Sequence, residues 1–211
     1  MDLQALSDEF HRRFNEKMVA REAALVASRK AIRSSANAIR AIHRGEADEA
    51  QRLMSEARQA LDEGEAATER HQDIRHAGFL HDAQKEYAEA RLTEAVVFGG
   101  DLPGADEVGV TPSAFLNGMA ETIGEARRTV LDLLRSGEAS RAERILGVMD
   151  EMYGVLVTID YPDAITGNLR RSTDVARSII ERTRGDLSVS LVQRDLRDAL
   201  ERHAEELRGG A

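Results

Sequence analysis

The sequence predicts an all-α protein, and three observations support that prediction. Alanine, leucine, glutamate and arginine, which all favour helices, dominate the 211 residues, and only 3 prolines interrupt them. Apolar residues recur mostly at the spacing of an amphipathic helix, and no segment shows the alternation of a β-strand. Hydrophobic residues make up 42% of the chain, which suits a globular protein with a sizeable core. We therefore expect one helical domain over residues 1–211, with a disordered tail from about 208 to 211.

The expected helices are bounded by glycine and proline. Gly45 ends the first expected helix after two basic residues, and Gly99-Gly100 ends the third. The segment 101–110, with Leu102-Pro103-Gly104, reads as a loop, after which Thr111 caps a helix that begins at Pro112. In order, the expected helices cover 3–43, 48–62 with a stop near Gly64, 74–98, 112 to the stop at Gly137, 138–157, a sixth restarted by Tyr161-Pro162, and a last one from Ser188 or Ser190.

Composition also bears on location and partners. The chain has no cysteine, no apolar run long enough to span a bilayer, and no signal-peptide pattern at its N-terminus, so we expect a cytoplasmic protein without membrane contact. Its net charge of −9 repels a phosphate backbone as a whole. The basic residues are nearly all arginines, whose guanidinium groups suit bidentate contact with phosphate. An excess of acids with few lysines would also fit a protein adapted to high salt.

Two pairs of acids carry the functional prediction. Glu86 and Glu89 stand at helical spacing, and so do Glu121 and Glu125 about one helix further on. Each pair can therefore point two carboxylates from one face of a helix. If the two helices lie side by side, four acids surround one point, where they would form a site for a hard cation. Such a cation activates water against phosphate esters.

Spacing alone does not establish a site, because this acidic chain forms such pairs freely. Glu46 and Glu49, for example, have the same spacing and are expected to lie on a solvated face. Tyr87 is expected to be a core or interface aromatic, and Lys85 to point away from Glu86 into solvent.

Several segments, taken together in their order, resemble the translin and translin-associated factor X family, and its archaeal members in particular. The long first helix, the helix of Glu86 and the helix after the loop each have a counterpart there. The matching segments are Arg21 to Lys30 continuing to Arg44, Phe79 to Val97 with the EYxEA pattern at Glu86-Tyr87-Ala88-Glu89-Ala90, Pro112 to Arg128, and Tyr161 to Arg177.

The resemblance implies a seven-helix protomer that assembles into a hollow, barrel-like homo-oligomer, usually an octamer, which binds single-stranded RNA or DNA inside the shell. Members that resemble translin-associated factor X cleave RNA with a divalent metal, Mg²⁺ or Mn²⁺. Members that resemble translin lack part of the acid set and serve mainly to bind nucleic acid.

Both glutamates of the EYxEA pattern are present, so the chain resembles the catalytic branch. By resemblance, the catalytic and metal-binding residues are Glu86, Glu89, Glu125 and Glu121. Glu121 departs from the family pattern, which places aspartate there. Glu125 stands in a Gly-Glu-x-x-Arg context common to both branches, which gives it a structural role as well.

Basic residues just before the helix of Glu86 fall where translin-type members contact nucleic acid. They are Arg70, His71, Arg75 and His76. Ordinary surface charges are the equally open alternative for these four.

The predicted function is a metal-dependent endoribonuclease that acts on short single-stranded RNA inside a homo-oligomeric shell. A non-catalytic protein that binds single-stranded RNA or DNA on the same scaffold is the alternative. A third and more generic possibility is a helical interaction module without any nucleic-acid ligand.

Overall fold

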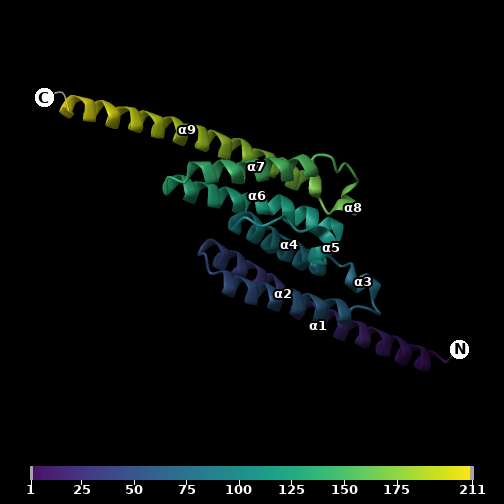
Figure 1. Cartoon of the computed structure of the whole chain (residues 1–211). Coiled ribbons are helices and arrows are strands. Elements are labelled where there is room, and N and C mark those ends of the chain that lie inside the picture. Colours follow the sequence, from purple (N-terminus) through teal and green to yellow (C-terminus); the bar gives the residue numbers. More distant parts are fainter. Residues whose placement is uncertain (1, 210–211) are drawn as a thin grey trace. The chain divides into compact units, whose positions relative to one another are not determined.

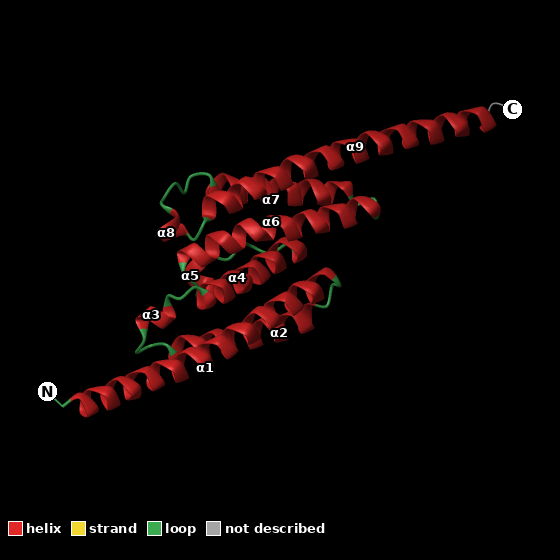
Figure 2. Cartoon of the chain, turned by 180° about the vertical axis from the view of Figure 1, so that it is seen from behind, coloured by secondary structure: helices red, strands yellow, loops and turns green. Residues whose placement is uncertain are grey.

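The computed structural model describes residues 2–209, which contain helices and loops but no strand (Figure 2). This confirms the predicted all-α class. Six of the described helices are long and three are single turns (Figure 1). The long helices are α1 (Leu3–His43), α2 (Ala47–Ala67), α4 (Phe79–Phe98), α6 (Pro112–Arg135), α7 (Ala139–Leu156) and α9 (Leu169–Gly209), and the single turns are α3 (Gln72–Arg75), α5 (Ala105–Val108) and α8 (Asp163–Thr166).

The chain divides into two compact units. The first contains the residues up to Met119 together with Pro162–Gly167, and the second contains Ala120–Tyr161 and the residues from Asn168 onward. The boundary falls inside α6, so this helix is continuous from one unit into the other. The single domain over 1–211 stays a prediction.

Small side chains allow the helices of the first unit to pack closely. α1 and α2 lie side by side in Figure 1, and α4 packs against both. The buried face of α1 is made largely of alanine, and α2 contributes further fully buried alanines. Gly64 lies at this contact, where a Cβ atom would stand 2.8 Å from Leu80 Cδ2 and 3.3 Å from Ala27 Cβ. The predicted stop near Gly64 is therefore wrong, because this glycine permits close packing inside a helix that continues to Ala67.

Three other predicted boundaries differ from the structure. The helix expected from Ile74 begins at Phe79, because Gly78 has a φ of 97° and separates α3 from α4. The loop expected at 101–110 contains the single turn α5. No new helix starts at Ser188, whose Oγ donates a hydrogen bond to the Arg184 carbonyl at 2.8 Å inside a continuous α9.

In the second unit, α7 packs along α9. Met149 and Met152 bury their side chains on α7, and Arg184 of α9 donates hydrogen bonds to both oxygens of Asp150 at 2.8 and 3.0 Å. The disordered tail was expected from about residue 208. Arg208 and Gly209 are instead the last residues of α9, and residues 210–211 lie outside the described part of the chain.

The outer ends of α1 and α9 have no buried residues within their own units. On α1, burial begins only at Ala20, and on α9 no residue described after Leu187 is buried. None of the helices within residues 2–209 combines the length and hydrophobicity that crossing a membrane requires.

Candidate functional site

The register between α4 and α6 is set by a glycine contact. Gly118 on α6 is buried against α4, so closely that a Cβ atom there would stand 2.7 Å from the Lys85 carbonyl oxygen. The same atom would lie 2.9 Å from Ala88 Cβ and 3.0 Å from the Glu89 backbone nitrogen. Because these neighbours are mostly backbone, only glycine allows this approach. The contact brings the segment of α4 that carries the acids directly against α6.

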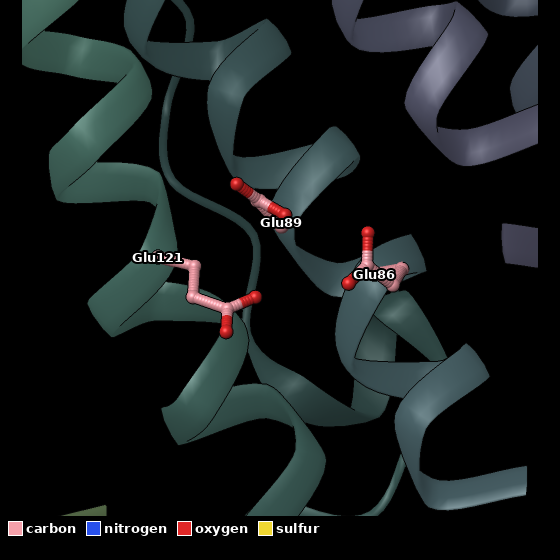
Figure 3. Close-up of side chains that lie close together, drawn as sticks. All are labelled: Glu86, Glu89 and Glu121. Carbon is pink, nitrogen blue, oxygen red and sulfur yellow. The ribbon is translucent and has the colours of Figure 1, made fainter. Parts of the chain in front are cut away.

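Three of the four predicted acids come together. Glu86, Glu89 and Glu121 each offer one carboxylate oxygen, and these oxygens all lie within 4.8 Å of one another. Figure 3 shows the Glu86 and Glu89 side chains on one helix and that of Glu121 on the neighbouring helix. Glu89 is buried, with 8% of its surface exposed, while Glu86 and Glu121 are half-buried. We call these three residues the acid cluster.

Glu125 is not a member of the acid cluster among the described residues. It lies one turn beyond Glu121 on α6 and is half-buried. Glu121, whose residue type departs from the family pattern, is therefore the acid of α6 that joins Glu86 and Glu89. The roles of all four acids in catalysis and metal binding stay predictions.

Of the two residues next to Glu86 in sequence, Tyr87 lies where the sequence predicted and Lys85 does not. Tyr87 is 4% exposed and lies under the guanidinium of Arg58, 5.7 Å from the ring centre, which agrees with its predicted core position. Lys85 was expected to point into solvent. It is instead half-buried, with its ammonium nitrogen 3.5 Å from a Glu86 carboxylate oxygen. The long lysine side chain can reach around the helix, so residue spacing alone misplaced its charge.

The acid cluster has the chemistry of a hard-cation site. All its donors are carboxylate oxygens, the ligands that Mg²⁺ and Mn²⁺ prefer, and neither histidine nor cysteine takes part. The residues present therefore fit a divalent metal, and the donor set does not distinguish Mg²⁺ from Mn²⁺.

The predicted nucleic-acid residues lie on the segment between α2 and α4. Arg70 and His76 are exposed, and His71 and Arg75 are half-buried. The segment is attached to α1 by Lys17, whose ammonium donates to Asp73 at 2.6 Å and lowers the pKa of that carboxyl group. Arg75 and His76 line a cavity, whereas Arg70 and His71 do not.

That cavity contains polar residues that the sequence prediction missed. His81 Nε2 lies 3.0 Å from Ser113 Oγ, and Gln84 accepts hydrogen bonds from the backbone and the hydroxyl of Thr111. His81 and Ser113 are 32 positions apart in sequence, so no local pattern could have paired them. Ser113 stands at the start of a predicted helix, but His81 does not, because the helix that contains it was expected to begin at Ile74 rather than at Phe79.

The fold and the acid cluster together define a translin-like helical protein. No protein-family model matches the chain. Among solved structures it is similar to AfC3PO, with 34% sequence identity and a TM-score of 0.81 over 89% of this chain and 97% of AfC3PO. A complex of AfC3PO with duplex RNA gives 33% identity and a TM-score of 0.79 over the same shares. The chain belongs to the C3PO family of the translin and translin-associated factor X type.

The chain is also similar to two more distant proteins. The structure of apo-NeC3PO has the same fold, with a TM-score of 0.76 over 90% of this chain and 97% of that chain, although only 18% of the residues are identical. The uncharacterized protein MJ0175 of Methanocaldococcus jannaschii is 29% identical over 184 residues, which cover 86% of this chain and 81% of the relative.

Proposed function

We propose that this protein is a metal-dependent endoribonuclease that binds and cleaves short single-stranded RNA inside a homo-oligomeric shell. The observation that carries the proposal is the convergence of the Glu86, Glu89 and Glu121 carboxylates on one point. The similarity to AfC3PO, which has been solved with duplex RNA, supports RNA as the ligand.

Each acid has a distinct role in this proposal. Glu86, Glu89 and Glu121 would hold a Mg²⁺ or Mn²⁺ ion, which when bound polarises the phosphodiester and a water molecule. Buried Glu89 provides the fixed ligand, because its surroundings restrict its carboxylate. Lys85 orients the Glu86 carboxylate and adds positive charge where the phosphate arrives. Glu125 lies one turn further along α6. We propose it as an additional metal ligand on the side from which the water molecule approaches the phosphodiester.

RNA contacts are proposed for Arg70, His71, Arg75 and His76. The four residues lie on one short segment just before α4, the helix that carries Glu86 and Glu89. Arg70 and Arg75 supply positive charge in a chain whose net charge is −9, so the electrostatic attraction for RNA must be local.

A homo-oligomer, with an octamer as the expected size, is supported by two exposed apolar stripes. On α1 the stripe comprises Leu3, Leu6, Phe10, Phe14 and Met18, which are between 40% and 71% exposed. On α9 it comprises Val189, Val192, Leu196, Leu200 and Leu207, which are between 57% and 68% exposed. Apolar stripes of this length are typical of surfaces that contact another protein chain.

The alternative is a protein that binds single-stranded RNA or DNA without cleaving it. Two observations favour it: Glu121 replaces the aspartate expected in the catalytic branch, and the net charge is strongly negative. The longer glutamate side chain shifts where its oxygen can meet a cation.

Cleavage of end-labelled RNA by the purified protein separates the two functions. We expect cleavage of single-stranded RNA with Mg²⁺ or Mn²⁺ and none with EDTA, because the acid cluster needs a cation to act. A duplex of the same sequence tests the preference for single strands. Binding without cleavage under every metal condition would assign the chain to the alternative. If labelled RNA shows no salt-sensitive binding, both nucleic-acid functions are excluded.

Metal binding can be measured without any RNA. A ligand at 100 times its dissociation constant stabilises the folded state by about 2.7 kcal/mol, which for a chain of this size raises the melting temperature by about 5–10 °C. We expect such a rise with Mn²⁺ or Mg²⁺ for the wild type. We expect most of it to be lost in Glu89→Gln, which keeps the side-chain shape but removes the charge. A full rise in that variant would place the metal elsewhere.

A further inference from the structure

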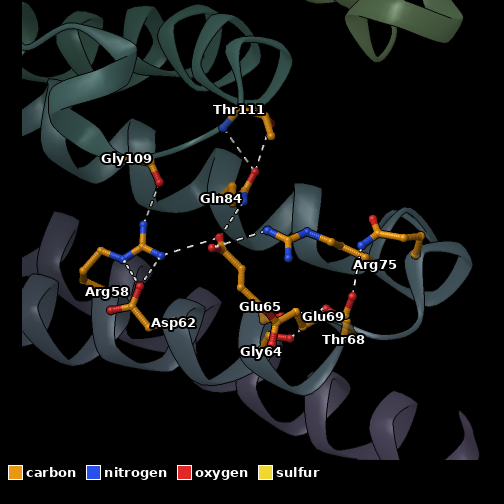
Figure 4. A network of polar contacts seen from close by, with 11 residues as sticks. Arg58, Asp62, Gly64, Glu65, Thr68, Glu69, Arg75, Gln84, Gly109 and Thr111 are labelled. Atoms are coloured by element: carbon orange, nitrogen blue, oxygen red, sulfur yellow. Dashed lines mark hydrogen bonds and ion pairs between the residues drawn. The ribbon is translucent and has the colours of Figure 1, made fainter.

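The cavity beside the acid-bearing helix has a volume of about 460 Å³, within the range of small-ligand pockets. Its walls come from the end of α2, the segment around α3, the starts of α4 and α6, and the turn of α8. All of these segments belong to the first compact unit. Figure 4 shows the part of this wall formed by Glu65, Arg75, Gln84 and Thr111.

Basic side chains converge on the cavity. Arg75, His76 and His81 all line it, against a single lining acid, Glu65. The Glu65 carboxylate already has partners within the protein, because Gln84 donates a hydrogen bond to it at 2.8 Å and the Arg58 guanidinium lies 3.5 Å from it. Arg75 is 3.8 Å from Glu65, which is too long for a hydrogen bond, so its guanidinium retains donors for a ligand.

Two long helices begin at the same cavity. Gly78 and Leu80 stand at the start of α4, and Thr111 and Ser113 at the start of α6. The first backbone N–H groups of a helix have no partner within it and carry partial positive charge, which favours anions. The helix starts therefore add to the positive charge of Arg75 and to the hydrogen-bonding nitrogens of His76 and His81.

The residues that form the cavity wall around His81 are closely packed. His81 Nε2 is 3.0 Å from Ser113 Oγ, and a Cβ atom on Gly167 would stand 3.0 Å from that oxygen and 3.1 Å from His81 Cε1. The α8 turn that carries Gly167 is fixed by Asn117, whose Nδ2 donates to the Thr166 carbonyl at 2.7 Å. Two exposed acids stand next to lining residues: Asp82, 3.8 Å from His81 Nδ1, and Asp163, which precedes Ala164 in the α8 turn.

We propose that this cavity binds a phosphate monoester. A guanidinium, two imidazoles, a hydroxyl and two helix starts converge from different sides, which matches a group with several charged oxygens better than a carboxylate with two. The α8 turn forms one side of the cavity, so a ligand that enters as a chain end fits better than a strand passing through.

The proposed source of the phosphate is the phosphorylated end of an RNA, and this step rests on the proposed function. Along α4, Glu86 and Glu89 follow His81 by about 7–12 Å at a rise of 1.5 Å per residue. A terminal phosphate held in the cavity would therefore set the cleavage position relative to the RNA end. The same chemistry would accept a free mononucleotide, and the test below distinguishes the two sources.

Binding of inorganic phosphate and of adenosine 5′-monophosphate to the full chain tests the cavity directly. The titration is run calorimetrically in EDTA, so that neither metal binding nor cleavage enters, with adenosine as the unphosphorylated comparison. We expect saturable binding of both phosphates and none of adenosine. In Arg75→Gln the affinity should fall by about 10- to 100-fold, as for the loss of hydrogen bonds to a charged group.

Matched variants separate a lost ligand contact from a damaged fold. Arg144→Gln removes an exposed arginine of α7 outside the cavity and should bind the phosphates as the wild type does. Ser113→Ala removes one hydroxyl from the wall and should weaken binding while the helical content is unchanged. Absence of phosphate binding in the wild type, or equal affinities in all three variants, would overturn the proposal.

RNA ends supply the second part of the test. Single-stranded RNAs of one sequence carry a 5′-phosphate, a 3′-phosphate or only hydroxyl ends, and their binding is compared in EDTA. Tighter binding of one phosphorylated RNA, lost in Arg75→Gln, would support the RNA end as the source. Phosphate binding without any end preference would support a site for free mononucleotides. Because no cleavage is measured, a phosphate site can be confirmed even if the ribonuclease proposal fails.

Discussion

The double variant Glu86→Ala/Glu89→Ala is expected to lose metal-dependent RNA cleavage by about 10³-fold or more. It removes two of the three carboxylates whose oxygens lie within 4.8 Å of one another, which leaves Glu121 as the remaining acid of the cluster. Metal ions contribute several kcal/mol of charge stabilisation to such reactions, and each 1.4 kcal/mol corresponds to about tenfold in rate. Time courses with end-labelled single-stranded RNA at saturating Mg²⁺ measure the loss.

A second glutamate pair provides a matched control. Glu46 and Glu49 have the same spacing and charge, but they lie on the surface, where Glu46 pairs with Arg44 at 2.5 Å and Glu49 with Arg52 at 2.6 Å. Exposed ion pairs of this kind contribute little to stability. Glu46→Ala/Glu49→Ala should therefore retain wild-type cleavage while changing the net charge equally.

The outcome assigns the acids a role only if other properties are unchanged. Both variants should keep their RNA affinity in EDTA and their size in light scattering. Equal losses in the two variants would mean that net charge, rather than the acid cluster, controls activity. Full cleavage by the Glu86→Ala/Glu89→Ala variant would contradict the proposed site.

Local sequence patterns predicted the helices well, because amphipathic spacing is a local property. They failed where glycine has a tertiary role. Gly64 was interpreted as a helix stop, but it lies inside α2, where Leu80 and Ala27 approach it too closely for a larger residue. Gly78, which was not interpreted as a break, takes a φ of 97° and separates α3 from α4. Sequence alone does not show whether a glycine serves backbone conformation or close packing.

The acid cluster could be predicted only in part for the same reason. Glu121 and Glu125 share a face of α6, and spacing cannot decide which of them meets α4. That choice depends on where α6 touches α4, and the contact is fixed by Gly118, one turn before Glu121. The pairing of His81 with Ser113 likewise depends on this contact between two helices and leaves no trace in either local segment.

Gly118 is therefore the position where the second large effect is expected. Gly118→Ala should destabilise the protein by about 1–3 kcal/mol, as overpacking in a core does, and lower the melting temperature by about 2–12 °C. In an exposed helix the same change would be favourable by about 1 kcal/mol. The sign reverses here because the new methyl group meets the Lys85 carbonyl oxygen at 2.7 Å and the Glu89 nitrogen at 3.0 Å, which are backbone atoms that cannot rotate away.

Gly124→Ala is the control on the same helix. Its Cβ atom would have Ile179 Cδ1 as nearest neighbour at 3.9 Å, an ordinary contact, so this variant should be as stable as the wild type or slightly more stable. Thermal unfolding compares the two, and the RNA cleavage assay compares their activity. Because Gly118→Ala displaces α6 from the helix that carries Glu86 and Glu89, it should lower cleavage even at temperatures where it is folded. If Gly118→Ala matches Gly124→Ala in both assays, the close approach does not set the register of the acid cluster.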